Sequence, residues 1–217
     1  MCYVLCAMCH ALTEHIAVAE YRKNMTPATI KIFDADPLDA NFVHRKRISH
    51  IAVGSAEEAA RHCPQSGMNT YVIRIFNSVP DSMGLYPELQ EGHTWIREYY
   101  FDDLDASKWP DAGKLAHAIA ADDIVLFNSK MAAQILADFE DIIHTHNIDL
   151  LLIHCQAGAS RSPAVAGALC SLYGIGKNAD VVEHFRQTPY IPNRHVATTL
   201  IDAGKKGMGL VSVMSFP

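Results

Sequence analysis

The stretch that decides the fold is Leu150–Pro163, which reads LLLIHCQAGASRSP. It opens with apolar residues that do not alternate with polar ones, a pattern typical of a strand covered on both faces. Small residues follow Cys155, and the pair Ser162-Pro163 is typical of a helix start, with Ser162 as the N-cap and Pro163 as the first helical residue. The stretch therefore predicts a buried strand, a short loop and a helix in direct succession.

The predicted loop has the composition of an anion-binding site. A helix N-terminus presents free N–H groups and a partial positive charge. Small residues let the backbone curl so that successive N–H groups face one point, and Arg161 adds a guanidinium fork that fits two oxygens of a phosphate. Cys155 stands at the mouth of this cradle, which favours the thiolate form. A thiolate that faces a bound phosphate is placed for in-line attack.

The pattern His-Cys-x5-Arg-Ser with an internal glycine resembles the signature of the cysteine-dependent protein tyrosine phosphatase superfamily, in its dual-specificity-like and prokaryotic branch. The resemblance implies that Cys155 attacks phosphorus, and that Arg161 binds the phosphoryl oxygens together with the loop amides. It also implies that Ser162 assists the thiolate as leaving group, and that His154 holds the loop and tunes the thiol. The phosphate-binding residues that it implies are Gln156, Ala157, Gly158, Ala159, Ser160 and Arg161.

Phosphate ester cleavage also requires an acid that protonates the leaving oxygen. The family carries this aspartic acid on a loop that follows a strand upstream of the cysteine. Residues 95–101 have the composition of such a strand, and the chain continues as Asp102-Asp103. The resemblance therefore implies Asp103 as the general acid, with Asp102 as the next candidate.

A second position competes for the role of the acid. Trp109-Pro110-Asp111 spells the acid-loop triplet of the classical tyrosine phosphatases, which makes Asp111 an alternative. Both candidate positions lie farther upstream of Cys155 than in compact members of the family. The choice among Asp102, Asp103 and Asp111 stays open at this point.

Two further segments resemble parts of small dual-specificity phosphatases. Asn77–Asp81 follows a strand and resembles a loop that borders the pocket. Pro192-Asn193 resembles the pair that opens a late helix near the active site, so Asn193 is a supporting candidate. The alternative role for Asn193 is that of a plain helix cap.

The chain from residue 48 onward alternates strand and helix patterns. Ser55 and Glu58 form a capping box at the start of one helix, and the apolar spacing after Ser129 predicts another. The expected strands are 48–53, 70–76, 95–101 and 150–153, and the expected helices are 56–62, 129–146, 163–173, 180–187 and 195–203. This order predicts an α/β fold, with a central, mostly parallel sheet of four or five strands flanked by helices on both faces. Residues 102–127 read as a long irregular stretch.

We expect three parts along the chain. Residues 1–47 form an N-terminal arm or extra layer that the sequence does not assign further. Residues 48–203 form the phosphatase-like catalytic domain, and residues 204–217 form a C-terminal tail.

Composition narrows the class of protein. The chain has 217 residues with a formal net charge of −6, and 49% of its residues are hydrophobic against 19% charged. These values exclude wholesale disorder and do not supply the positive field that non-specific nucleic-acid binding uses.

No run of 18 apolar residues is present, so we expect no membrane-spanning helix. The six cysteines are not spaced as a disulfide framework, which favours the reducing cytoplasm. Oligomeric state is not predicted.

The N-terminal segment contains a haem-attachment motif and residues that could bind a metal. Cys6–His10 spells the haem-attachment motif, and these residues with Cys2 could also bind zinc. No export signal precedes the motif, and the histidines elsewhere show no ligand spacing. We therefore expect neither a metal nor a cofactor.

These inferences combine into one predicted function, the metal-free hydrolysis of phosphate monoesters through a cysteinyl-phosphate intermediate. The expected partner is a protein or peptide that carries phosphotyrosine or phosphoserine/threonine, with no nucleic acid or membrane involved. The first alternative is a phosphate-binding pseudophosphatase without a working general acid. The second is a different chemistry on the same loop, such as sulfur transfer or arsenate reduction, for which Cys170 is the nearest further thiol in the sequence.

Overall fold

The computed structural model describes residue 30 and residues 32–34, 48–78, 86–105, 111–121, 124–175, 179–185, 187 and 189–207. Several features singled out in the sequence lie outside these residues. They are the cysteines at positions 2, 6 and 9 with His10, the segment Val79–Asp81, the pair Trp109-Pro110, and the chain beyond residue 207.

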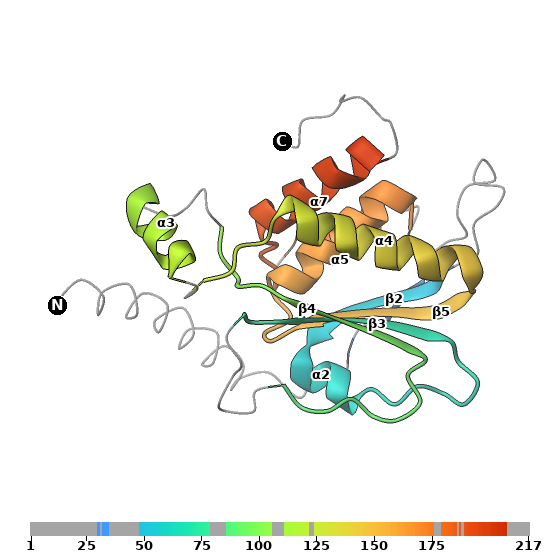
Figure 1. Ribbon diagram of the computed structural model, residues 1–217. Helices are drawn as coiled ribbons and strands as arrows, with labels where there is room; N and C mark the ends of the chain where they lie inside the picture. The colour runs from blue at the N-terminus through green and yellow to red at the C-terminus, as the bar shows by residue number, and fades with distance from the viewer. Residues whose placement is uncertain are drawn as a thin grey trace.

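A five-stranded sheet forms the centre of the molecule (Figure 1). Its order is β1 (Ile32–Asp34), β2 (Ile48–Ser55), β5 (Ile148–Cys155), β3 (Thr70–Phe76) and β4 (Trp95–Tyr100). Strands β2, β5, β3 and β4 run parallel, and only β1 is antiparallel to its neighbour. The predicted α/β class with a mostly parallel sheet is confirmed. Strand β1 belongs to the first 47 residues, so part of that segment extends the sheet at its edge.

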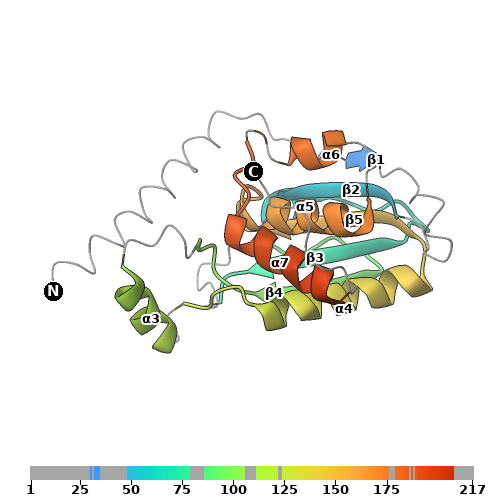
Figure 2. The ribbon, with the colours of Figure 1, turned by 90° about the horizontal axis from the view of Figure 1, so that it is seen from above.

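Helices cover both faces of this sheet. The short helix α2 (Ala56–Arg61) lies on one face, and α4 (Ser129–Thr145), α5 (Arg161–Tyr173) and α7 (Arg194–Gly207) lie on the other (Figure 1). Figure 2 shows α6 (Ala179–His184) beside β1, where Phe33 packs on His184 at 4.5 Å between ring centroids. Helix α3 (Ala112–Ala120) projects away from the sheet. None of the helices in the described ranges is both long and apolar enough to cross a bilayer.

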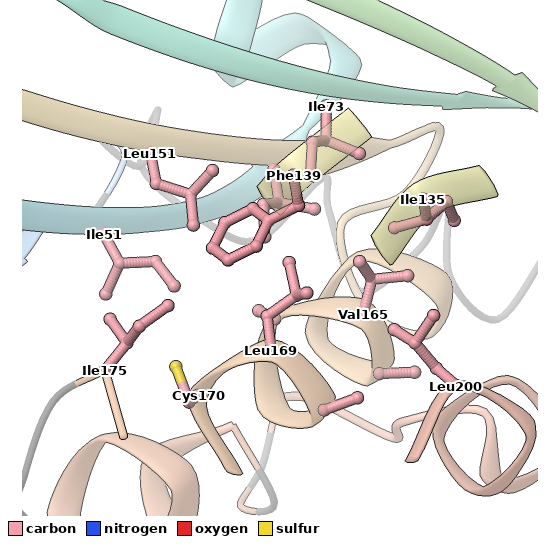
Figure 3. Close-up of a cluster of buried hydrophobic side chains, with 14 of the residues drawn as sticks. Ile51, Ile73, Ile135, Phe139, Leu151, Val165, Leu169, Cys170, Ile175 and Leu200 are labelled. Atoms are coloured by element: carbon pink, nitrogen blue, oxygen red, sulfur yellow. The ribbon is translucent and has the colours of Figure 1, made fainter. Parts of the chain in front are cut away.

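Strand β5 lies inside the sheet, and its apolar residues serve two cores. Leu151 and Ile153 join the large cluster beneath the three long helices, together with Phe139 of α4 (Figure 3). Leu150 and Leu152 join the smaller cluster beneath α2. Both faces of the strand are therefore buried, which explains why its sequence does not alternate.

The start of α5 differs from the prediction. The helix begins at Arg161 with Ser160 at the N-cap position, two residues earlier than the expected cap at Ser162. The side chains of Arg161 and Ser162 are both buried, so the first helical turn is built from the signature residues themselves. The Ser-Pro pair therefore predicted the start of the helix about half a turn too late.

Two other boundaries also differ. The stretch 102–127 was expected to be irregular, but it contains α3, which begins after Asp111 as its N-cap. Helix α7 continues to Gly207 and so includes the first residues of the expected tail. There Gly204 packs so closely on Leu172 that an added Cβ would lie 2.6 Å from a leucine methyl carbon.

The large core gives a stability prediction. Phe139 is fully buried, and its ring contacts those of Tyr71 and Tyr173 at centroid distances of 6.3 and 4.9 Å. We expect Phe139→Ala to lower the free energy of unfolding by about 3–5 kcal/mol, measured by urea denaturation, because it leaves a cavity between helix and sheet. Lys130→Ala on the exposed side of the same helix is the control and should change it by less than about 0.5 kcal/mol. A loss below about 1 kcal/mol for Phe139→Ala would contradict this packing.

Candidate active site

The candidate site lies where the parallel strands end. Cys155 is the last residue of β5, residues 156–160 form the loop, and Arg161 is the first residue of α5. Cys155 is 1% exposed and Arg161 is 3% exposed. The carboxyl edge of such a sheet is where ligands bind in open α/β folds.

Arg161 ties the loop to two neighbouring strands. Its Nη1 donates to the carbonyl oxygens of Phe76 at 3.1 Å and Phe101 at 2.8 Å, which are the last residue of β3 and the residue after β4. Its Nε is buried and has no hydrogen-bond partner among the described residues. Because a buried guanidinium N–H is rarely left unpaired, this nitrogen is available to an anion.

Ser162 lies next to the candidate nucleophile. Its Oγ is 3.2 Å from Cys155 Sγ and 3.5 Å from the carbonyl oxygen of Gly54. All three residues are buried. The hydroxyl can therefore donate to a thiolate, which is the contact that assistance to a leaving thiolate requires.

The loop packs on the end of strand β2. Gly158 has φ +74°, and a Cβ there would lie 2.5 Å from both Gly54 C and Ser55 N. The Gln156 carbonyl accepts from Ala56 N at 3.3 Å. The close approach and the left-handed conformation both require glycine at position 158.

The segment after β3 also borders the loop. Asn77 Nδ2 donates to Gln156 Oε1 at 3.4 Å. This contact brings the first residue of the Asn77–Asp81 segment against the phosphate loop, while Val79–Asp81 lie outside the described residues.

His154 is a buried neutral residue. It is fully buried on β5, in register with Gly54 and Arg74 of the neighbouring strands. Burial, followed by the positive charges of Arg74 and His93, lowers the pKa of His154 to about 3. Neither ring nitrogen hydrogen-bonds to any described residue. A histidine held neutral in this way does not shuttle protons at neutral pH.

Asp103 contacts the phosphate loop directly. Its Oδ1 accepts from Ser160 Oγ at 2.7 Å and from Asn193 Nδ2 at 2.9 Å. The carboxylate itself is solvent-exposed. The Ser160 hydroxyl therefore donates to Asp103 and does not cap helix α5.

Asn193 combines the two roles that the sequence left open. Its Nδ2 donates to Asp103, while its Oδ1 accepts from Val196 N at 3.1 Å and so caps α7. Its backbone N–H donates to the Ser160 carbonyl at 3.2 Å. The side chain thus connects the loop after β4 to the start of α7.

The other two aspartates stabilise the backbone elsewhere. Asp102 accepts from Val125 N at 2.8 Å and from both the backbone N–H and the hydroxyl of Ser78. Asp111 caps α3 by accepting from Gly113 N at 2.9 Å and Lys114 N at 3.1 Å. Within the described ranges, the hydrogen bonds of these two carboxylates go to such loops and caps, whereas those of Asp103 reach the phosphate loop.

Neither metal ligands nor a second reactive thiol accompany the site in the described part of the chain. No group of three or more His, Cys, Asp or Glu residues there could hold a metal ion. Cys170 faces the large core (Figure 3), and burial raises its pKa to about 12. Cys2, Cys6, Cys9 and His10, the residues that could bind zinc by their spacing, lie outside the described residues.

One residue near the site carried no signal in the sequence. Tyr86 lies far upstream of the signature, yet its hydroxyl is buried beside the Arg161 guanidinium. Only a tertiary contact brings the two together, so neither a motif nor a spacing rule could have found it.

Comparison with known proteins gives structural matches only. No family model matches the chain, and no curated protein matches it. The human tyrosine phosphatase-like serine/threonine/tyrosine-interacting protein has a TM-score of 0.48 at 15% identity, over 74% of this chain and 93% of that one. Human DUSP28 has a TM-score of 0.44 at 20% identity, over 76% and 97%. The Yvh1 phosphatase domain from Chaetomium thermophilum has a TM-score of 0.36 at 18% identity, over 77% and 99%.

The printed names of these three proteins are those of phosphatases or phosphatase-like proteins. Their identities of 15–20% and TM-scores of 0.36–0.48 assign neither a superfamily nor an activity to this chain. The chemistry of the site therefore has to be argued from its own geometry.

The loop geometry gives a second prediction. We expect Gly158→Ala to destabilise the protein by about 1–3 kcal/mol, because alanine would be strained at positive φ and would clash with the Gly54 backbone. Gly167→Ala is the matched control, since an added methyl group there meets nothing within 4 Å and helix α5 should gain up to about 1 kcal/mol. Thermal unfolding followed by circular dichroism measures both. Equal melting temperatures for the two variants would contradict the close approach.

Proposed function

We propose that the protein is a cysteine-dependent phosphatase that hydrolyses phosphate monoesters on a phosphorylated protein or peptide. The observation that supports this most is the grouping of Cys155, Ser162 and Arg161 at the start of α5. The sulfur lies 3.2 Å from the Ser162 hydroxyl, a contact in which either atom can donate, and the buried guanidinium retains an unpaired Nε among the described residues. A dianionic phosphoryl group supplies the charge and the acceptors that this arrangement lacks.

Substrate binding uses the helix end and the loop. The Ser160 side chain does not cap α5, and a helix N-terminus presents N–H groups that favour an anion. Arg161 Nε and the amides of residues 156–161 bind the phosphoryl oxygens. Since Nη1 is held by two carbonyls, the orientation of the guanidinium is fixed before the substrate arrives.

The first chemical step transfers the phosphoryl group to sulfur. The Cys155 thiolate attacks phosphorus in line, and an S–P bond forms as the P–O ester bond breaks. Protonated Asp103 gives its proton to the leaving oxygen. Because Oδ1 already accepts from Ser160 and Asn193, Oδ2 is the oxygen that carries this proton.

The second step releases phosphate. Water attacks the phosphorus of the cysteinyl-phosphate and gives a proton to the Asp103 carboxylate. The S–P bond breaks, and the Ser162 hydroxyl stabilises the returning thiolate. No metal takes part in this route, and both steps use the same cradle to stabilise charge on the equatorial oxygens.

The proposed partner is a protein that carries phosphotyrosine or phosphoserine/threonine. Cys155 is 1% exposed, so the phosphoryl group has to reach the sulfur on a side chain that extends inward. We also propose a reducing, cytoplasmic location, because the route requires Cys155 to remain a free thiol, as it is here together with Cys63 and Cys170.

The nucleophile is tested with an aryl phosphate substrate. We expect Cys155→Ser to lower kcat by at least about 10³-fold, because a serine hydroxyl is not ionised in this site. Cys63→Ser, at an exposed cysteine, should retain the wild-type rate. Incubation of the wild-type enzyme with EDTA should also leave the rate unchanged. Activity that survives in Cys155→Ser, or that EDTA abolishes, would overturn the route.

The general acid is tested by comparing two aspartates. We expect Asp103→Asn to lower kcat by about 10²-fold on substrates with a poor leaving group, because an amide cannot protonate the leaving oxygen. Asp111→Asn should keep the cap of α3, since asparagine caps as well as aspartate, and should leave the rate unchanged. A wild-type chain that binds phosphate with only trace turnover, insensitive to either change, would instead be the pseudophosphatase.

A further inference from the structure

We propose that the Tyr86 hydroxyl is an additional phosphate ligand, which donates a hydrogen bond to an oxygen of the bound phosphoryl group beside Arg161. This inference rests on the proposed function, because it assigns a further binding residue to the same site. Three features support it: the fixed position of the ring, the unpaired hydroxyl, and the protonation state.

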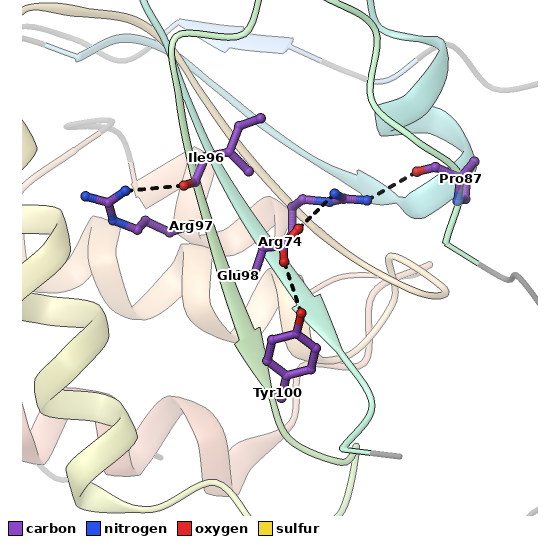
Figure 4. Close-up of polar contacts among 6 residues, drawn as sticks. All are labelled: Arg74, Pro87, Ile96, Arg97, Glu98 and Tyr100. Atoms are coloured by element: carbon purple, nitrogen blue, oxygen red, sulfur yellow. Dashed lines mark hydrogen bonds and ion pairs between the residues drawn. The ribbon is translucent and has the colours of Figure 1, made fainter. Parts of the chain in front are cut away.

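A rigid set of contacts holds the Tyr86 ring. It packs edge-on against Phe76, the last residue of β3, at 4.5 Å between centroids. The next residue, Pro87, gives its carbonyl oxygen to Arg74 Nη2 at 3.2 Å (Figure 4). Arg74 is itself buried and paired with Glu98 at 3.0 Å. Strand β3 therefore fixes the backbone next to Tyr86 and the face on which its ring rests.

The hydroxyl at the end of this ring lies in the candidate site. Its oxygen lies near the Arg161 guanidinium and the Asn77 backbone N–H, and both act on it as donors, so the hydrogen of the hydroxyl is the part left for an acceptor. Its oxygen is buried and makes no hydrogen bond of good geometry with any described residue. Arg161 Nε is likewise buried and has no hydrogen-bond partner among the described residues. Each of these two buried groups lacks an acceptor among the described residues, and the oxygens of one phosphoryl group can accept from both.

The protonation state suits a donor. Burial raises the pKa of Tyr86 above the usual value for tyrosine, and this outweighs the opposite effect of Arg161. The group is therefore a neutral hydroxyl at physiological pH. Such a hydroxyl can donate to the dianion, and the cation beside it makes it a stronger donor.

A purely structural role for Tyr86 makes a different prediction. If the ring only packs on Phe76, phenylalanine should replace it without effect on ligand binding. If the hydroxyl binds the anion, its removal should weaken binding even though the fold is retained. Tyr100 provides the matched control, because its ring stacks on the same Phe76 at 5.2 Å and its hydroxyl donates to Glu98, away from the phosphate loop.

The test is the affinity of the full-length chain for tungstate, a tetrahedral oxyanion, measured by isothermal titration calorimetry. We expect Tyr86→Phe to raise Kd by about 10-fold or more, since a hydrogen bond to a charged group is lost, and Tyr100→Phe to leave Kd unchanged. Melting temperatures of both variants confirm that they are folded. We also expect kcat/KM for an aryl phosphate to fall in parallel in Tyr86→Phe alone.

The outcomes separate this inference from the proposed function. If wild type binds tungstate and hydrolyses the aryl phosphate through Cys155, but Tyr86→Phe equals wild type in both assays, the role of Tyr86 is wrong and the phosphatase stands. Equal losses in Tyr86→Phe and Tyr100→Phe would indicate packing and would also overturn it. A wild-type chain that neither binds tungstate nor turns over substrate would overturn both proposals.

Discussion

The rest of the site depends on how one buried cation is held. Arg161 lies at the first position of α5, and its Nη1 donates to the carbonyl oxygens of Phe76 and Phe101. Carbonyl groups orient the guanidinium but do not neutralise it, and a buried charge without a counterion is costly. In the described part of the chain no carboxylate forms an ion pair with it. The fold therefore keeps a preorganised positive group at the end of three strands, and under the proposed function a phosphoryl dianion would supply the missing charge.

The same loop that would bind phosphate also positions the proposed acid. Ser160 donates its hydroxyl to Asp103, and Asn193 donates to the same carboxylate oxygen while it caps α7. Three chain segments therefore meet at Asp103 Oδ1, and Oδ2 is left for the proposed proton transfer. Because Ser160 belongs to the loop, a change in loop conformation would move the acid as well. This coupling explains how an exposed aspartate at the rim can keep a defined orientation.

The features that the sequence predicts are those encoded by residues that lie close together in the chain. Strand β3 was expected at its observed bounds, Thr70–Phe76, because β-branched and aromatic residues fill it between turn signals. The loop after β5 was recognised because Cys155 and Arg161 are close in the chain. The resemblance implied Asp103 as the acid but left Asp102 and Asp111 open, and the contacts of Asp103 with Ser160 and Asn193, 57 and 90 residues away, could not be predicted from neighbouring residues. The start of α5 was predicted two residues too late from the local Ser-Pro pair, and Tyr86 reaches the site only through tertiary packing.

The most direct test of the central claim is to trap the covalent intermediate. The wild-type chain is mixed with an aryl phosphate labelled with ³²P, quenched within milliseconds by denaturant, and digested for peptide mapping. The account predicts label on the peptide that contains Cys155, with more of it when release is slowed in Asp103→Asn. Steady turnover with no labelled protein, or label on a peptide that lacks Cys155, would contradict it.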